Sequence, residues 1–341
     1  MIKFTKMHGL GNDYIVINTI NDENIIAKDK IPSLTRFLCD RHFGAGADGV
    51  ILVKTSKVAD FKMRIYNKDG SEAQMCGNGI RCFAKYVYEN KFTDKTCIYI
   101  ETRAGIKNAY LRIERNTVIE ITVCMGKPEL DSKQLKKIGF IHEHFNKKIS
   151  IDDKKFEIFP VSMGNPHAVI FVGKNSTIDV QKYGKIIEKN EFFPEKTNVE
   201  FVRVLDRGHI KIQVWERGVG ETYACGTGAC AALAVCSYLG FTKRFATVNL
   251  KGGDLFVNWS LQDNQIYMTG IATKVFDGEL TKGTENFGWF SAIFLRPLWL
   301  ISTSIHQAFH QLFLQLQFFH YMDILHPYIQ YISHCQDQEV Q

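Results

Sequence analysis

The sequence predicts an α+β fold of two pseudo-symmetric lobes, each a curved, mainly antiparallel sheet around one central helix. The chain has 341 residues, 45% of them hydrophobic, which suffices for two domains and an extension. Short alternating stretches typical of strands dominate, and helical stretches are few. A Cys-Gly-x-Gly phrase followed by an apolar, helix-like run occurs once in each half, at Cys76 and at Cys225. This whole-lobe repeat predicts two similar lobes with a cleft between them.

Alternation and turn residues define the elements of the first half. Apolar and polar residues alternate in the opening stretch, a glycine-rich phrase at 9–13 interrupts it, and a strand pattern then resumes. The turn Lys68-Asp69-Gly70 precedes the first cysteine phrase. We therefore expect a short helix at Ser33–Cys39 and strands at Ile2–Met7, Tyr14–Ile17, Val50–Val53 and Phe61–Asn67.

The second half repeats this plan. A helix is expected at Val180–Lys189, and strands at Phe156–Ser162, Ala168–Val172, Val199–Leu205, Ile210–Glu216, Gln265–Met268 and Ile271–Phe276. The charged stretch Arg112–Thr117 is the expected boundary. We predict an N-terminal lobe at 1–117, completed by the strand region 265–280, and a C-terminal lobe at 118–264.

The composition changes abruptly at the C-terminal end. No lysine follows Lys282, and aromatic residues crowd the region 282–341. The run Trp289–Ile305 approaches the length of a membrane span, but Arg296 and Pro297 interrupt its middle. We expect an atypical aromatic-rich tail that is unrelated to the catalytic lobes. Binding at a membrane interface is the alternative for this segment.

Charge and cysteine usage exclude several classes of function. The net charge is +6 and the lysines are scattered, so no nucleic-acid-binding face is expected. The cysteines number nine, without a CxxC pair and without a secretory signal before them. That pattern predicts reduced thiols in the cytoplasm and neither a disulfide framework nor a metal site.

The two cysteine phrases carry the chemistry. A cysteine at a helix start lies beside unpaired N–H groups and the positive end of the helix dipole, which lower a thiol pKa. The glycines allow the backbone to approach a ligand closely. Two matched thiols suit the transfer of a proton from one face of a carbon to the other. Cys82 and Cys230 lie further into each helix, where packing is the expected role.

Six motifs in order resemble diaminopimelate epimerase over about residues 1 to 280. They are Gly9-Leu10-Gly11-Asn12-Asp13, Asn67-Lys68-Asp69-Gly70-Ser71-Glu72, Met75-Cys76-Gly77-Asn78-Gly79-Ile80-Arg81-Cys82, Gly164-Asn165-Pro166-His167, Trp215-Glu216-Arg217-Gly218 and Ala224-Cys225-Gly226-Thr227-Gly228. The resemblance implies a two-lobed, cofactor-independent isomerase. It also implies interconversion of LL- and meso-diaminopimelate on the route to lysine and peptidoglycan precursors.

The resemblance assigns roles to individual residues. Cys76 and Cys225 are the two catalytic thiols, and His167 and Glu216 assist them. Glu216 also belongs to the substrate-binding set, which comprises Asn12, Asn67, Gly77, Asn78, Asn165, Asn198, Arg217, Gly226 and Thr227. Arg217 is expected to hold the distal carboxylate. The resemblance implies no cofactor and a homodimer as the partner state.

Two positions depart from the family pattern. Gly49 stands where many members have glutamine, so no side-chain contact is expected there. Phe276 stands where the family often has tyrosine at the dimer contact. Three other functions remain as alternatives: a proline or hydroxyproline epimerase of the same fold, a thiol redox protein, and a module that binds an anion on its glycine loops.

Overall fold

A computed structural model describes the chain except for residues 23–24, 131–145, 153, 174–175, 283–289 and 297–341; from residue 281 to 296 it describes the backbone alone. All elements below belong to one compact unit, Met1–Leu295, apart from the last residue of the final strand. The predicted tail, 282–341, lies outside the described residues except for Lys282 and strand β19 (Phe290–Arg296). Within the described part of the chain, no helix has the length and apolar character needed to cross a membrane.

The strands of the first half form a mixed sheet that β18, from near the end of the chain, completes at one edge. The strand order is β18-β1-β2-β3-β4-β6-β7-β8. Neighbouring strands are antiparallel except for the parallel pairs β2–β3 and β4–β6. The short β5 pairs with β4. The strands are β1 (Ile2–Gly9), β2 (Asn12–Asn18), β3 (Gly49–Lys54), β4 (Phe61–Asn67), β5 (Glu72–Ala73), β6 (Cys97–Thr102), β7 (Gly105–Glu114), β8 (Thr117–Gly126) and β18 (Thr273–Lys282).

The second half repeats this order strand for strand, as β9-β10-β11-β12-β13-β15-β16-β17. The parallel pairs are β11–β12 and β13–β15, and the short β14 pairs with β13. The strands are β9 (Lys147–Ile151), β10 (Lys154–Ser162), β11 (Pro166–Phe171), β12 (Asn198–Asp206), β13 (His209–Glu216), β14 (Gly220–Thr222), β15 (Phe245–Leu250), β16 (Gly253–Trp259) and β17 (Ile266–Gly270). The predicted α+β class is confirmed.

The two halves are joined within one sheet. β8 and β17 pair antiparallel, with Met268 opposite Val123. Each half also gives its last strand to the first strand of the other, because β9 pairs with β10 and β18 pairs with β1. The stretch Arg112–Thr117 contains the end of β7, the turn of the β7–β8 hairpin and the first residue of β8. Because the sheet runs through both halves, the limits of the two lobes stay a prediction.

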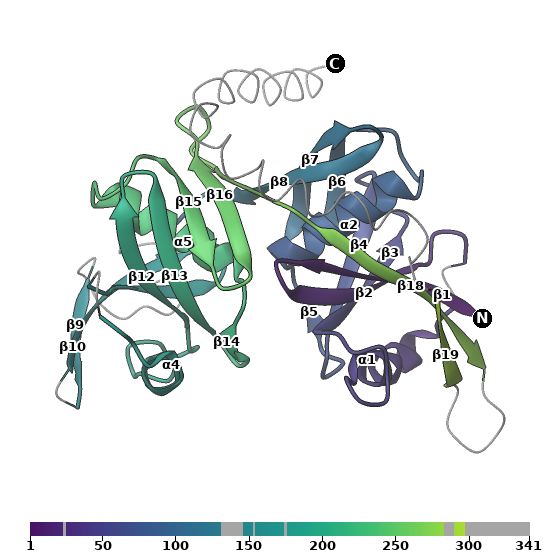
Figure 1. Cartoon of the computed structure of the whole chain (residues 1–341), viewed down its shortest axis with the longest axis horizontal. Helices are drawn as coiled ribbons and strands as arrows, with labels where there is room; N and C mark the ends of the chain where they lie inside the picture. The colour runs from purple at the N-terminus through teal and green to yellow at the C-terminus, as the bar shows by residue number, and fades with distance from the viewer. Residues whose placement is uncertain (23–24, 131–145, 153, 174–175, 283–289, 297–341) are drawn as a thin grey trace, which may run out of the picture. The chain divides into compact units, whose positions relative to one another are not determined.

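Each half holds one long helix against the inner face of its strands and one short helix on the outer face (Figure 1). The inner helices are α2 (Gly77–Glu89) and α5 (Gly226–Tyr238), and the outer ones are α1 (Ile31–Cys39) and α4 (Val180–Glu188). Strand residues alternate between the two cores: Val16 packs in the α2 core, whereas Ile15 and Ile17 pack in the α1 core. Both faces of these strands are therefore apolar, as expected where helices cover a sheet on both sides.

Candidate active site

Each of the two cysteines caps the N-terminus of an inner helix. Cys76 is the N-cap of α2 and Cys225 the N-cap of α5, both with extended backbone. The N–H of Gly228 donates to Cys225 Sγ at 3.4 Å, and the N–H groups of Asn78 and Gly79 favour the thiolate of Cys76. Both thiols thus lie where helix N–H groups are unpaired, as the sequence predicts.

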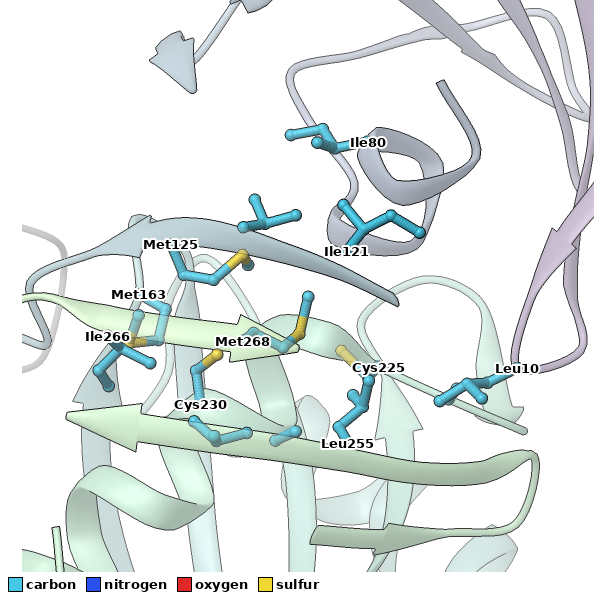
Figure 2. Packing of buried hydrophobic residues seen from close by; sticks show 14 of the residues in the cluster. Leu10, Ile80, Ile121, Met125, Met163, Cys225, Cys230, Leu255, Ile266 and Met268 are labelled. Atoms are coloured by element: carbon cyan, nitrogen blue, oxygen red, sulfur yellow. The ribbon is translucent and has the colours of Figure 1, made fainter. Parts of the chain in front are cut away.

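The two helix starts adjoin each other. A Cβ on Gly226 would lie 3.8 Å from the Cα of Gly77. Met268 of β17 packs against both glycines. A Cβ on Gly226 would lie 3.0 Å from Met268 Sδ, and a Cβ on Gly77 would lie 2.9 Å from Met268 Cε. Figure 2 shows Met268 beside Cys225 and close to Met125. A side chain at either glycine would push on the methionine side chains, and the absence of one lets the two backbones approach each other this closely.

A hydrogen bond also connects the two cysteine phrases. Asn78, the second residue of α2, donates from Nδ2 to the carbonyl of Ala224 at 3.0 Å. Arg81, which is fully buried, holds the other end of this amide by donating to Asn78 Oδ1 at 2.8 Å. The guanidinium also donates to the carbonyl of Ile271 at 3.2 Å. A buried positive charge therefore lies one helical turn from Cys76.

The sulfur of Cys76 is surrounded by hydrogen-bonding groups of β2. The hydroxyl of Tyr14 lies 3.0 Å from Cys76 Sγ and 2.8 Å from Asn12 Oδ1. The thiol of Cys76 itself lies 3.6 Å from the same amide oxygen. Asp48 fixes the orientation of that amide, because Asn12 Nδ2 donates to Asp48 Oδ2 at 2.9 Å.

Acidic residues surround the sulfur of Cys225. Glu216, at the end of β13, makes a side-chain hydrogen bond with Cys225 and accepts one from the Thr222 hydroxyl at 2.6 Å. Its charge raises the pKa of both Cys225 and Cys76. The hydroxyl of Thr227 is 3.5 Å from Cys225 Sγ.

A buried histidine–glutamate pair, His167 and Glu200, lies near Cys225. His167 is fully buried, with Nδ1 2.7 Å from Glu200 Oε1 and Nε2 3.0 Å from Asn165 Oδ1. Asn165 Nδ2 in turn lies 3.4 Å from the hydroxyl of Thr227. Glu200 is also fully buried, and within the described residues its Oε2 has no hydrogen-bond partner. This chain of contacts links His167 to the start of α5.

The remaining predicted residues lie in two groups. Asn198 accepts a hydrogen bond from the N–H of Arg217 at 2.9 Å and donates to the carbonyl of Pro166 at 2.9 Å. The Arg217 side chain is exposed, and it donates to the carbonyl of Glu195 at 3.1 Å. Asn67 is exposed at the end of β4, opposite Gly49 of β3, and its amide donates to the Ser71 hydroxyl at 3.1 Å.

Burial changes the expected acidity of the thiols. It raises the pKa of Cys76 above its usual value, although the Tyr14 hydroxyl and the helix N–H groups lower it. Burial, followed by the charges of Glu216 and Glu200, raises the pKa of Cys225 much further. The sequence predicts lowered values from the helix starts alone. In the structure the cost of burying a charged sulfur outweighs the N–H groups at both cysteines.

Within the described residues no group of three or more His, Cys, Asp or Glu side chains is placed to hold a metal ion. The thiols of Cys82 and Cys230 are fully buried among apolar residues of α2 and α5. Burial raises the pKa of Cys82 to about 12 and that of Cys230 further still. These two thiols therefore pack as neutral core groups.

Comparison with known proteins identifies the family. The model of the diaminopimelate epimerase family matches residues 4–130 and 159–275. The chain belongs to the diaminopimelate epimerase family. A curated diaminopimelate epimerase of Methanococcus maripaludis strain C5 is 49% identical over 280 residues, covering 82% of this chain and 99% of the relative. One from Agathobacter rectalis is 46% identical over 286 residues, with the same coverage of 82% and 99%. The resemblance seen in the sequence is confirmed.

Solved structures of more distant proteins share the fold of this diaminopimelate epimerase family member. A hydroxyproline epimerase from Agrobacterium vitis has a TM-score of 0.59 at 16% identity, covering 81% of this chain and 91% of its own. A probable proline racemase from Agrobacterium radiobacter K84 has a TM-score of 0.61 at 16% identity, covering 84% and 94%. At such low identity these likenesses describe the architecture alone.

Sequence reasoning missed Tyr14 and Glu200, which contact the predicted site residues of this family member. Both signals were available. Tyr14 follows Asn12 by two positions in a strand, and Glu200 follows Asn198 by two, so each pair lies on one face of its strand. Glu200 moreover stands between the apolar residues Val199 and Phe201 of β12, which is typical of a buried charged group with a specific partner.

Proposed function

We propose that this protein interconverts LL- and meso-diaminopimelate by moving a proton between two thiols, without a cofactor. The reaction would serve the synthesis of lysine and peptidoglycan precursors. One observation carries the proposal: Cys76 and Cys225 cap two helices whose first glycines lie against each other. The family membership of the chain supports the choice of substrate.

The helix starts are suited to hold the α-carboxylate of the substrate. Helix N-termini bind anions because their N–H groups are unpaired and the helix dipole is positive there. In our proposal Gly77, Asn78, Gly226 and Thr227 bind this carboxylate through their N–H groups. Negative charge grows there when the α-proton leaves, so the same groups stabilise the transition state more than the ground state.

The proton transfer balances between the two sulfurs. The thiolate of one cysteine takes the α-proton, and the C–H electron pair stays on the substrate as a carbanion beside the carboxylate. The thiol of the other cysteine then gives its proton to the opposite face of that carbon. One sulfur has gained a proton and the other has lost one, so the reverse reaction starts from the product state.

Raised thiol pKa values suit this step. The α-proton of an amino acid is weakly acidic, and a thiolate with a higher pKa is a stronger base for it. The same shift reduces the fraction of thiolate at neutral pH. Hydrogen bonds from Tyr14, Asn78 and Gly79 offset part of that loss at Cys76.

Residues around the thiols would recognise the rest of the substrate. We propose that Glu216 and His167 assist proton movement at Cys225, and that Arg217 holds the distal carboxylate as a planar, doubly hydrogen-bonding cation. The amides of Asn12, Asn67, Asn165 and Asn198 would bind the distal polar groups. An ordinary amino acid without a distal end would leave such partners unpaired and bind poorly.

The first prediction concerns the two thiols. We expect Cys76→Ala or Cys225→Ala to lower epimerisation of LL-diaminopimelate by at least about 1000-fold, because each removes a proton donor or base. Chiral analysis of the product, without added cofactor and in deuterated water, measures both turnover and deuterium at the α-carbon.

Cys82→Ala and Cys230→Ala are the matched controls, since they remove buried thiols from the same two helices. They should keep activity within about threefold while lowering stability by about 1 kcal/mol for the lost packing. Full turnover by Cys76→Ala or Cys225→Ala would contradict the mechanism. Turnover of proline or hydroxyproline instead, or reversible disulfide chemistry without deuterium uptake, would favour the alternative functions.

The homodimer and the cytoplasmic location stay predictions. Within its own chain, Phe276 packs edge-on against Phe4 with ring centres 6.2 Å apart. Lys6 Nζ lies 5.9 Å from the centre of the Phe276 ring. A phenyl ring thus keeps an apolar surface on β18 at the position of the expected dimer contact. Light scattering at micromolar concentration tests the dimer directly.

A further inference from the structure

Tyr14 holds, in the first half, the position that His167 holds in the second. In β2–β3 Tyr14 pairs with Gly49, and in β11–β12 His167 pairs with Asn198. Each residue lies two positions after an asparagine and bonds that amide oxygen, Asn12 at 2.8 Å and Asn165 at 3.0 Å. The strand order around the two pairs is the same. The repeat therefore places a phenol beside one cysteine phrase and an imidazole beside the other.

The amide oxygen of Asn12 is the centre of a small set of donors. The Tyr14 hydroxyl lies 2.8 Å from it, Asn78 Nδ2 donates to it at 3.2 Å, and the Cys76 thiol lies 3.6 Å from it. The orientation of this amide is fixed, because Nδ2 at its other end donates to Asp48 Oδ2. Arg41 holds the other oxygen of Asp48 at 2.9 Å.

The Tyr14 hydroxyl has a single proton and two acceptors within reach, Asn12 Oδ1 and Cys76 Sγ. When the sulfur carries its own proton, that proton points to Asn12 Oδ1, and the hydroxyl gains nothing by donating to the sulfur. When the sulfur is a thiolate, it is by far the stronger acceptor. Asn12 Oδ1 then keeps the hydrogen bond from Asn78, so no buried oxygen is left without a donor.

We propose that Tyr14 is a positioning residue whose hydroxyl turns from Asn12 to Cys76 when Cys76 loses its proton, and so stabilises the thiolate. The inference rests on the proposed function, in which Cys76 is a base. Rotation of a hydroxyl about its C–O bond requires no movement of the ring. The hydroxyl proton can thus follow the charge on the sulfur during each turnover.

The ring of Tyr14 is held in place by the surrounding strands. It is buried, and a Cβ on Gly49 would lie 3.2 Å from its Cε1 and 2.5 Å from the carbonyl oxygen of Tyr66. The absence of a side chain at Gly49 therefore lets the ring cross the strand pair toward Cys76. Burial, followed by the charge of Cys76, raises the pKa of Tyr14 well above its usual value, so the phenol stays a donor throughout.

Other titratable groups near this pair come from two elements. The carboxylate of Glu216 on β13 raises the pKa of both Tyr14 and Cys76. Arg81 and the thiol of Cys82, both on α2, also act on them. None of these groups is removed by Tyr14→Phe, which deletes the hydroxyl alone. A change in Cys76 after that substitution is therefore attributable to the lost hydrogen bond.

The test measures the two thiols rather than turnover. Iodoacetamide labels thiolates, and peptide mass spectrometry follows Cys76 and Cys225 separately across pH. In Tyr14→Phe we expect the midpoint of Cys76 labelling to rise by about one pH unit, equivalent to about tenfold slower labelling at neutral pH. The midpoint of Cys225 should stay unchanged. The kcat for diaminopimelate should fall by a similar factor, with KM little affected.

Tyr86→Phe is the matched control, because Tyr86 is a buried tyrosine of α2 ten residues after Cys76. It should leave both midpoints in place. An unchanged Cys76 midpoint in folded Tyr14→Phe would overturn the proposal. A shifted midpoint in a protein that does not act on diaminopimelate would instead overturn the proposed function alone.

Discussion

The two halves of the molecule share a backbone plan and differ in the charges they place around it. In the first half Cys76 is accompanied by neutral groups, Asn12 and Tyr14, and by the buried cation of Arg81. The equivalent positions in the second half belong to Asn165, His167 and Cys230, as the paired registers of β2–β3 and β11–β12 and the two helix starts show.

The contrast extends to the neighbouring strands. Ile51 on β3 corresponds to Glu200 on β12, because each lies opposite the residue two positions after Tyr14 or His167. Asn67 at the end of β4 corresponds to Glu216 at the end of β13. Two carboxylates of the second half thus replace an apolar and an amide side chain of the first. The repeat sets where the sulfurs lie, and the charges of Glu216 and Glu200 raise the pKa of Cys225.

The largest test of this comparison is Glu216→Gln. We expect epimerisation to fall by about 100-fold, because a carboxylate that assists proton movement is lost. The free energy of unfolding of this variant should rise at pH 8 although its activity falls. Burial raises the pKa of Glu216 in the folded protein. The contribution of Glu216 to the free energy of unfolding is therefore fully present at low pH and is lost as the pH rises through that raised pKa.

The Gln variant should therefore unfold at higher temperature than the unaltered protein at pH 8 and at the same temperature near pH 4. Calorimetry at the two pH values measures this difference. A Gln variant that is less stable than the unaltered protein at pH 8 would show that hydrogen bonds to the Glu216 carboxylate outweigh the cost of burying its charge.

The glycines at the third helix position sharpen the comparison. A Cβ on Gly228 would lie 2.7 Å from Glu200 Oε1, a buried and fixed group, and 3.3 Å from Cys225 Sγ. A Cβ on Gly79 would meet the tips of Ile65 and Ile51, at 3.2 Å and 3.3 Å, and Cys76 Cβ at an ordinary contact distance of 3.6 Å. We expect Gly228→Ala to lower the free energy of unfolding by about 2 kcal/mol from overpacking.

Gly79→Ala should cost less than about 0.5 kcal/mol, since helix propensity offsets a mild contact. Urea titration of the two variants side by side measures both values. Equal losses would mean that the carboxylate of Glu200 moves aside as freely as an isoleucine tip.

A smaller loss of activity than that of Glu216→Gln is expected for Glu200→Gln. Removing this charge should lower the pKa of Cys225, because Glu200 raises it, while Cys76 should not change. We expect about a tenfold loss of kcat as the bond to His167 Nδ1 weakens. Iodoacetamide labelling across pH checks the thiol, and a shift at Cys76 instead of Cys225 would contradict the assignment of charge to the second half.

The sequence predicted those parts of the fold and site that depend on local patterns. Strong alternation placed β4 at its observed bounds, and the glycines after Cys76 and Cys225 marked both helix starts. The helix expected from Ser33 begins earlier, at Ile31, because Pro32 favours the first turn. The strands β6, β7, β8, β9, β15 and β16 were not expected, although buried and less buried residues alternate along β6, β15 and β16.

Features that depend on distant contacts were beyond local patterns. The bond from Asn78 to Ala224 joins residues far apart in the chain, and Met268 beneath two glycines comes from a third region. The direction of the thiol pKa shifts depends on how completely the fold buries each sulfur. Only the assembled sheet determines that burial.

The reciprocal placement of β9 and β18 has a consequence for the origin of the chain. A single repeat, ending in its last strand, would leave its own first strand without an outer neighbour and would extend a free strand into solvent. Two identical copies would satisfy each other by swapping those strands, as domain-swapped dimers do. The present chain has the topology expected when such a pair is fused end to end, after which the copies were free to acquire different acids and bases.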